Sequence, residues 1–274
     1  MKEITLLIGH GSRDADGNLE FLDFIEEIRR QKPNEHFEAC FLELTTPTIH
    51  DGFAACVQQD AQRIIVIPVI LLAASHVKLE IPDFLEEARR QYPHVDIVYG
   101  RNIGLHAQMI DLLEDRFYEQ TNTFVSADIR QTSIVLMGRG SSDPDANGDL
   151  YKIARLLWER TGALTVEVCF TGITFPRLPE GIHRALLRDT KRVVIVPYFL
   201  FTGVLIKRMQ GILQEIQLEN TNVPMLMASY FGNQKRLVDI VLDRREEALH
   251  GHSFMNCDLC KYRKMPAYGE EEMR

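Results

Sequence analysis

The chain contains two copies of one sequence pattern, separated by a constant 129 positions, the interval from His10 to Arg139. The segment Gly9-His10-Gly11-Ser12-Arg13-Asp14 returns as Gly138-Arg139-Gly140-Ser141-Ser142-Asp143. The same interval relates Cys40 to Cys169, Pro47 to Pro176, Lys78 to Lys207, and Arg63–Pro68 to Arg192–Pro197. An interval that holds over about 70 positions indicates a duplicated domain. Within the 274 residues we therefore expect a first domain at 1–122, a second at 132–249 and a tail at 250–274.

Short apolar runs alternate with segments of helical periodicity in both copies. The expected strands are Glu3–Ile8, Glu38–Leu44, Arg63–Val69 and Val95–Tyr99, then Ile134–Met137, Thr165–Phe170, Val193–Pro197 and Met225–Ala228. The helices expected in the first copy are Asn18–Arg30, Pro47–Gln59, Val77–Gln91 and Leu105–Tyr118, and a last helix is expected at Lys235–Leu249. The polar segment Thr121–Gln131 is interpreted as a linker. Alternation of this kind predicts an α/β fold with two tandem doubly wound parallel sheets.

Charge and hydropathy exclude several classes of partner. The formal net charge is −8 and the chain has no run of Lys or Arg, which argues against nucleic acid and anionic membranes. The longest apolar stretch, Ile64–Ser75, is too short to span a bilayer, and no secretory signal follows Met1. Cys40, Cys56 and Cys169 stand among apolar residues and are interpreted as reduced core thiols. We therefore expect a cytoplasmic protein.

Three metal-capable side chains follow three strands of the first copy. His10 comes after the first strand, Glu43 stands at the end of the second, and His76 lies in the loop after the third. Carboxyl ends of parallel strands meet at one edge of a sheet, so the three side chains are expected to converge there. Taken singly, each has a structural alternative: a turn-capping histidine, a paired carboxylate and a loop histidine. Together they predict one catalytic metal site.

The second copy has lost every one of these candidates. Arg139, Gly172 and Leu205 stand at the equivalent positions, so this copy is expected to be catalytically silent. The second copy could line one side of a cleft, supply Arg139 or Lys207 to an anionic ligand, or only stabilise the fold. In the first copy, Ser12 and Arg13 stand where a helix N-terminus would favour carboxylate or phosphate. The segment lacks the Gly-x-Gly-x-x-Gly spacing, so no nucleotide cofactor is expected.

The motifs resemble those of the class II tetrapyrrole chelatases, in particular the long sirohydrochlorin chelatases of the CbiX/SirB type. The matching segments are Gly9–Arg13, Phe41–Leu44 with Pro47, Pro68 with Leu71–His76, Ile81-Pro82 and Gly138–Pro144, within a resemblance covering about residues 1 to 245. The resemblance implies an enzyme that inserts Co²⁺ or Fe²⁺ into sirohydrochlorin, releasing two protons, on the way to cobalamin or sirohaem. The metal and proton-transfer residues of the family fall on His10, Glu43 and His76.

The resemblance also implies contacts to a substrate with many carboxylates. Ser12, Arg13, Lys78 and Arg139 are the candidates, and for Lys78 a solvated surface position is the alternative. A non-catalytic tetrapyrrole or metal carrier on the same scaffold is the second functional hypothesis. A periplasmic-type ligand-binding protein is the third, and the absence of a signal peptide counts against it.

The tail contains Met255-x-Cys257-x-x-Cys260 beside His250 and His252. It resembles the tail of cobalt-type long chelatases, which carry a His-rich stretch and an iron–sulfur centre. Two cysteines cannot complete a four-cysteine cluster, so a second protomer or His ligands would be required. The hypotheses are therefore an iron–sulfur or metal site, with a homodimer formed through the tail, or an exposed dithiol with only adventitious metal.

Overall fold

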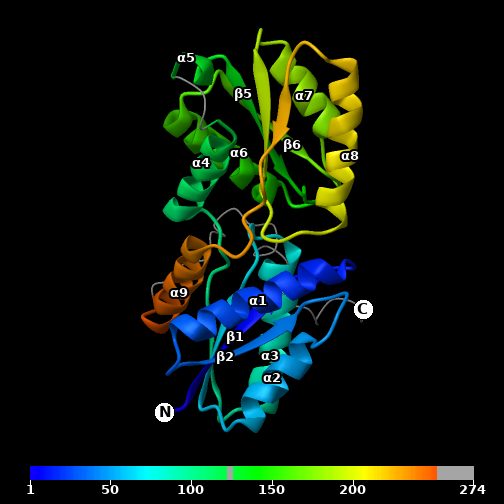
Figure 1. Cartoon of the computed structure of the whole chain (residues 1–274). Coiled ribbons are helices and arrows are strands. Elements are labelled where there is room, and N and C mark those ends of the chain that lie inside the picture. The colour runs from blue at the N-terminus through cyan, green and yellow to red at the C-terminus, as the bar shows by residue number, and fades with distance from the viewer. Residues whose placement is uncertain (122–125, 252–274) are drawn as a thin grey trace, which may run out of the picture.

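The computed structural model describes residues 1–121 and 126–251, which form two parallel four-stranded sheets, one in each repeat (Figure 1). The strand orders are β2-β1-β3-β4 and β6-β5-β7-β8. The predicted pair of doubly wound parallel sheets is confirmed.

The first repeat contains β1 (Glu3–Gly9), α1 (Ala15–Gln31), β2 (His36–Phe41), α2 (Ile49–Gln58), β3 (Arg63–Pro68), the π-helical turn η1 (His76–Glu80), α3 (Ile81–Gln91), β4 (Asp96–Tyr99) and α4 (Ala107–Thr121). After α5 (Ser126–Ile129), the second repeat contains β5 (Thr132–Gly138), α6 (Pro144–Thr161), β6 (Thr165–Phe170), α7 (Leu178–Leu186), β7 (Arg192–Pro197), α8 (Val204–Glu219), β8 (Met225–Met227) and α9 (Lys235–Leu249). The last helix has the predicted bounds.

The central strands are apolar throughout because helices cover both faces of each sheet. In the first sheet Leu6 pairs in register with Val66, and both belong to the core beneath α2 and α3. The next pair, Leu7 and Ile67, faces the opposite core beneath α1 and α9. That second core continues through the corresponding face of the other sheet, so one apolar cluster joins the two repeats.

The last helix of each repeat packs against the sheet of the other repeat. Helix α9 contacts β3, β4 and α1, whereas α4 contacts β7 and α6. In Figure 1, α9 stands beside the sheet of the first repeat and α4 beside the sheet of the second. The buried Arg244 of α9 donates to the carbonyl oxygen of Ile103 at 2.7 Å, and Arg116 of α4 donates to that of Phe231 at 2.8 Å. Each of the sequence units 1–122 and 132–249 therefore supplies its last helix to the core of the other.

The second strand and the helix after it begin and end elsewhere than predicted. Strand β2 stops at Phe41 and does not reach Leu44, whose φ of +67° is not a strand conformation, although the Leu42 amide still bonds to the Gly9 carbonyl at 2.9 Å. Pro47 does not lie in the first turn of α2. Thr48 caps this helix instead: its amide donates to Asp51 Oδ2 at 2.8 Å, and its hydroxyl accepts from the Asp51 amide at 3.3 Å.

Two further segments differ from the sequence prediction. The predicted helix Val77–Gln91 opens as the π-helical turn η1, in which the Ile81 amide bonds to the His76 carbonyl, five residues back. Pro82 follows directly, and because it has no N–H it cannot give the next turn its usual hydrogen bond. The predicted linker includes the short helix α5. The tail with Cys257 and Cys260 lies outside the described residues, and no helix among those described is long and apolar enough to cross a membrane.

Candidate functional site

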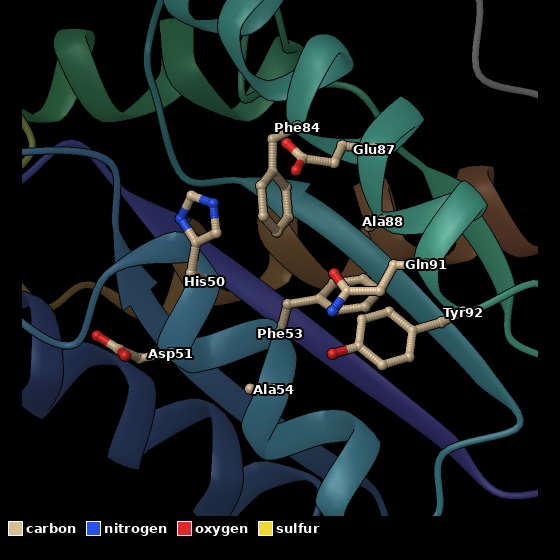
Figure 2. Close-up of a pocket in the computed structure, with 9 residues that line it drawn as sticks. All are labelled: His50, Asp51, Phe53, Ala54, Phe84, Glu87, Ala88, Gln91 and Tyr92. Atoms are coloured by element: carbon tan, nitrogen blue, oxygen red, sulfur yellow. The ribbon is translucent and has the colours of Figure 1, made fainter.

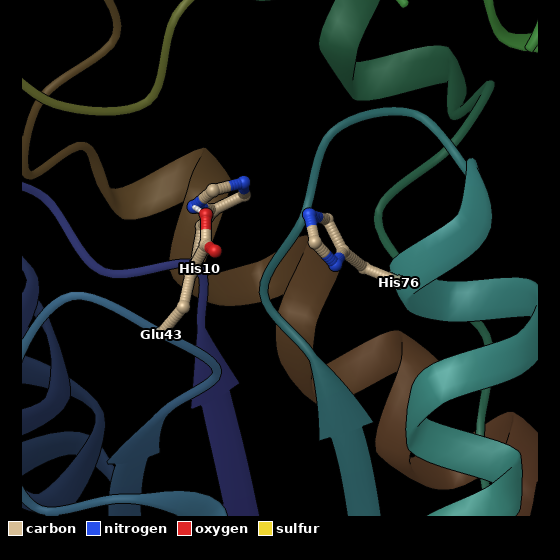
Figure 3. Close-up of side chains that lie close together, drawn as sticks. All are labelled: His10, Glu43 and His76. Carbon is tan, nitrogen blue, oxygen red and sulfur yellow. Dashed lines mark ion pairs between the residues drawn. The ribbon is translucent and has the colours of Figure 1, made fainter. Parts of the chain in front are cut away.

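His10, Glu43 and His76 meet at the carboxyl edge of the first sheet (Figure 3). His10 directly follows β1, Glu43 lies in the loop after β2, and His76 opens η1 after β3. One ligand atom from each residue lies within 4.8 Å of those of the other two. The two imidazoles stand edge to face, with ring centroids 4.9 Å apart. The convergence expected from the sequence is therefore present.

The backbone holds His10 and Glu43 together through a close approach of two loops. The Glu43 amide donates to the His10 carbonyl at 3.1 Å. Between them Gly11 adopts a φ of +89°, and a Cβ on this residue would lie 1.9 Å from the Glu43 carbonyl oxygen. Only glycine fits both the conformation and the space.

The surroundings of His10 favour the neutral form of its imidazole. Burial lowers the pKa of His10, and the charges of Arg139 and His76 act in the same direction. The Gly11 carbonyl, 3.2 Å from Nδ1, and Glu43, with Oε1 3.6 Å from Nδ1, oppose this effect without outweighing it. A neutral imidazole is the form that binds a metal ion.

Two contacts of this cluster were not expected from the sequence. Glu80 Oε1 lies 2.9 Å from His76 Nδ1, although that nitrogen makes no hydrogen bond of proper geometry. The i, i+4 spacing was the signal that could have shown this pair, had the predicted helix been extended by one residue from Val77 to include His76. Arg139 reaches the cluster from the second repeat, where its Nη1 lies 2.5 Å from His10 Nε2.

Lys78 points to the second repeat. Its side chain is 2% exposed, and Nζ lies 2.9 Å from Asp143 Oδ2 and 2.8 Å from Asp145 Oδ2. Burial alone would lower the pKa of Lys78, but the hydrogen bonds to Asp145 and Asp143 prevail and raise it. The ammonium group thus pairs with two carboxylates, and Lys78 does not have the solvated surface position that was its alternative. Its equivalent, Lys207, makes the reciprocal bridge to Asp14 and Asp16 at 2.8 and 2.9 Å.

Ser12 and Arg13 stand at the N-terminal end of α1. The Ser12 hydroxyl accepts a hydrogen bond from the Asp14 amide at 3.0 Å, and Ser141 makes the same contact to Asp143 in the second repeat. Because the repeat without the metal-capable residues keeps this turn, the Ser12 contact helps build the loop. Arg13 is exposed.

A separate hollow of about 290 Å³ lies between α2 and α3 (Figure 2). Aromatic rings line it, with His50 and Phe84 at a centroid distance of 4.8 Å and Phe53 and Tyr92 at 5.7 Å. It shares no residue with the His10, Glu43 and His76 cluster.

Fold and site together define an α/β protein with a candidate metal site at the edge of one of two duplicated sheets. The chain belongs to the CbiX family, whose model matches it twice, at residues 4–120 and 133–248.

Two curated relatives match nearly the whole chain. A sirohydrochlorin cobaltochelatase of Priestia megaterium is 44% identical over 264 residues, which cover 96% of this chain and 85% of the relative. A sirohydrochlorin ferrochelatase of Bacillus subtilis (strain 168) is 34% identical over 259 residues, which cover 94% of this chain and 97% of the relative. Among solved structures, SirB from Bacillus subtilis with Fe³⁺ matches with a TM-score of 0.79 and 35% identity, covering 92% of this chain and 98% of that one.

Proposed function

We propose that this chain is a sirohydrochlorin chelatase that inserts Co²⁺ or Fe²⁺ into the tetrapyrrole and releases two protons, in cobalamin or sirohaem biosynthesis. The observation that carries the proposal is the cluster of His10, Glu43 and His76, with ligand atoms within 4.8 Å at the edge of the first sheet. The names of the relatives support it, since they include both a cobaltochelatase and a ferrochelatase.

The donor set suits an ion that is bound and then given up. Imidazole and carboxylate are ligands for Fe²⁺ and Co²⁺, and three of them leave coordination positions open. The macrocycle nitrogens can enter those positions before the protein ligands leave. A closed four-ligand site would hold the ion too firmly for transfer.

Insertion replaces two pyrrole N–H bonds with bonds to the metal, so two protons leave for each ion inserted. Glu43 is the proposed acceptor, with the two histidines as alternatives. Its side chain is 43% exposed, against 23% for His10, so a proton accepted there passes readily to water. A general base within hydrogen-bond reach of the proton accelerates such a step.

Arg13 and Arg139 are the proposed contacts to the carboxylates of the macrocycle, and Ser12 is proposed to shape the loop after β1 that carries Arg13. A guanidinium presents paired donors that match a carboxylate. The second repeat is proposed to bind no catalytic metal, because Arg139, Gly172 and Leu205 replace the three ligands.

The test is an anaerobic assay of metal insertion with Co²⁺ and Fe²⁺ in turn, followed by the absorption change of sirohydrochlorin. We expect His10→Ala and His76→Ala to lose insertion with both metals, and Glu43→Gln to slow it. His50→Ala is the matched control, since it removes an imidazole from the hollow between α2 and α3. Wild-type rates of insertion in both His10→Ala and His76→Ala would overturn the site. Binding of sirohydrochlorin by the native protein without insertion would support the carrier hypothesis instead.

The tail is proposed to serve metal storage, redox sensing or contact between protomers rather than insertion. Cys257 and Cys260, separated by two residues, could share one metal or cluster. Iron and sulfide analysis of protein purified without oxygen, compared with a Cys257→Ser/Cys260→Ser variant, tests the iron–sulfur hypothesis.

A further inference from the structure

Arg139 contacts a ring nitrogen of the proposed metal ligand His10. The Arg139 side chain follows β5 of the second repeat and crosses to the first, where Nη1 lies 2.5 Å from His10 Nε2. Arg139 is the residue of the second repeat that is equivalent to His10. Two equivalent residues, one from each repeat, therefore contact each other here.

The chemistry of the two groups fixes where the proton on the imidazole lies. A guanidinium is always charged and has donors but no acceptor, so its N–H donates to a lone pair on Nε2. The neutral ring then carries its proton on Nδ1. The Gly11 carbonyl, 3.2 Å from Nδ1, is positioned to accept that proton's hydrogen bond. Both ring nitrogens of His10 are thus engaged.

Neither nitrogen can bind a metal ion while Arg139 stays in place. A metal at Nε2 needs the lone pair that Arg139 uses. A metal at Nδ1 requires the proton to move to Nε2, where it would face an N–H of Arg139. A ligating imidazole ordinarily donates its other N–H to an acceptor, and arginine has none to offer. Either geometry therefore requires Arg139 to withdraw.

We propose that Arg139 masks His10 until a carboxylate of the substrate draws the guanidinium away, so that the anionic macrocycle opens the metal site it is about to use. The proposal rests on His10 being a metal ligand. Its physical basis is the preference of a guanidinium for a carboxylate over a neutral imidazole. Arg139 is here a positioning residue that acts through His10.

The first test measures the affinity for Co²⁺ alone, without tetrapyrrole, by calorimetric titration. Loss of one charge-assisted hydrogen bond should tighten Co²⁺ binding about tenfold in Arg139→Ala. Arg139→Lys keeps the charge but not the planar guanidinium, so its affinity for Co²⁺ should lie between those of the native chain and Arg139→Ala. Arg155→Ala is the charge-matched control, because Arg155 lies on α6 and pairs with Glu159. Its Co²⁺ affinity should equal that of the native chain.

The second test measures the ring directly. Nitrogen-15 NMR of the histidines in the metal-free protein should show His10 with its proton on Nδ1, and Arg139→Ala should shift its Nε2 resonance. In a third measurement, metal-free sirohydrochlorin should bind Arg139→Ala several-fold more weakly than the native protein.

The outcomes separate this proposal from the site on which it rests. If His10→Ala loses Co²⁺ binding while Arg139→Ala binds Co²⁺ no more tightly than the native chain, Arg139 does not block metal binding by His10. The proposed metal site is then still supported. If His10→Ala binds Co²⁺ like the native chain, both are wrong. Unchanged sirohydrochlorin affinity in Arg139→Ala would show that no substrate carboxylate binds Arg139, which would contradict the proposed withdrawal of Arg139 from His10.

Discussion

Gly11 sets the distance between two of the three proposed ligands. Its φ of +89° and the 1.9 Å separation between a Cβ on this residue and the Glu43 carbonyl oxygen leave no room for a side chain. Any larger residue has to push the loop after β2 away from β1. Glu43 moves with that loop, so the geometry of the proposed metal site depends on a residue whose side chain is not a proposed ligand.

Gly11→Ala should therefore lower the affinity for Co²⁺ by at least tenfold and lower the free energy of unfolding by about 1–3 kcal/mol. Calorimetric titration and denaturant unfolding measure the two effects. The control is Gly148→Ala in α6, where the added methyl has no neighbour within 4 Å. Alanine suits a helix better than glycine, so this variant should be slightly more stable with native metal affinity. Native Co²⁺ affinity in Gly11→Ala would contradict the steric argument.

At the scale of elements, the exchanged helices decide which parts of the chain can fold alone. Helix α9 supplies one face of the core of the first sheet, and its Arg245 reaches the Thr5 hydroxyl of β1 at 2.9 Å. The first repeat without α9 leaves that face of β1 and β3 open to water.

A chain ending at Gln234 should lose the cooperative unfolding transition of the first repeat, although every residue of 1–122 is present. A chain ending at Gly251 keeps α9 and is the control. Urea unfolding followed by circular dichroism, with amide exchange of β1 and β3, distinguishes the two. Full protection of β1 in the shorter chain would show that α9 is not needed.

The alternation of strands and helices could be predicted because buried parallel strands and amphipathic helices leave different periodicities. The cluster of His10, Glu43 and His76 could be predicted because parallel strands bring their carboxyl ends to one edge. The exchange of α4 and α9 could not, because the apolar face of a helix does not say which of two similar sheets it covers. The pairing of Lys78 with Asp143 depends on how the repeats pack, which no local pattern encodes.

At the scale of the whole molecule, two reciprocal ion bridges join the repeats, and they differ in burial. Lys78 and Asp143 have side chains 2% and 4% exposed, whereas Lys207 in the equivalent bridge is 52% exposed. Reciprocal contacts between equivalent positions are those of a twofold-related pair. Since burial governs the cost of losing a charged partner, the two bridges are expected to contribute unequally.

Lys78→Met should lower the free energy of unfolding by about 3 kcal/mol, because it leaves Asp143 buried without its cation. Lys207→Met, the same change at the equivalent position, should have a small effect because water solvates Asp14 and Asp16 when the lysine is removed. Denaturant unfolding of the two variants in parallel provides the measurement. Equal losses would mean that burial does not distinguish the bridges.

A chain ending at Gly251 should bind one Co²⁺ and insert metal at the native rate. The three proposed ligands and Arg139 all lie before that residue, and the second repeat has Arg139, Gly172 and Leu205 at the ligand positions. Equilibrium dialysis gives the stoichiometry and the anaerobic assay gives the rate. Two bound ions would assign metal to the second repeat, and lost insertion would assign the tail to the mechanism.

The contact between His10 and Arg139 lies where the two repeats meet through equivalent positions. In a pair of identical separate chains, any change of this residue appears on both sides at once, so histidine faces histidine or arginine faces arginine. Fusion into one polypeptide removes that constraint, since each copy then mutates alone. A proposed metal ligand on one side and a permanent cation on the other is an arrangement that strict symmetry forbids. Joining two domains end to end thus made possible a division of labour within a single site.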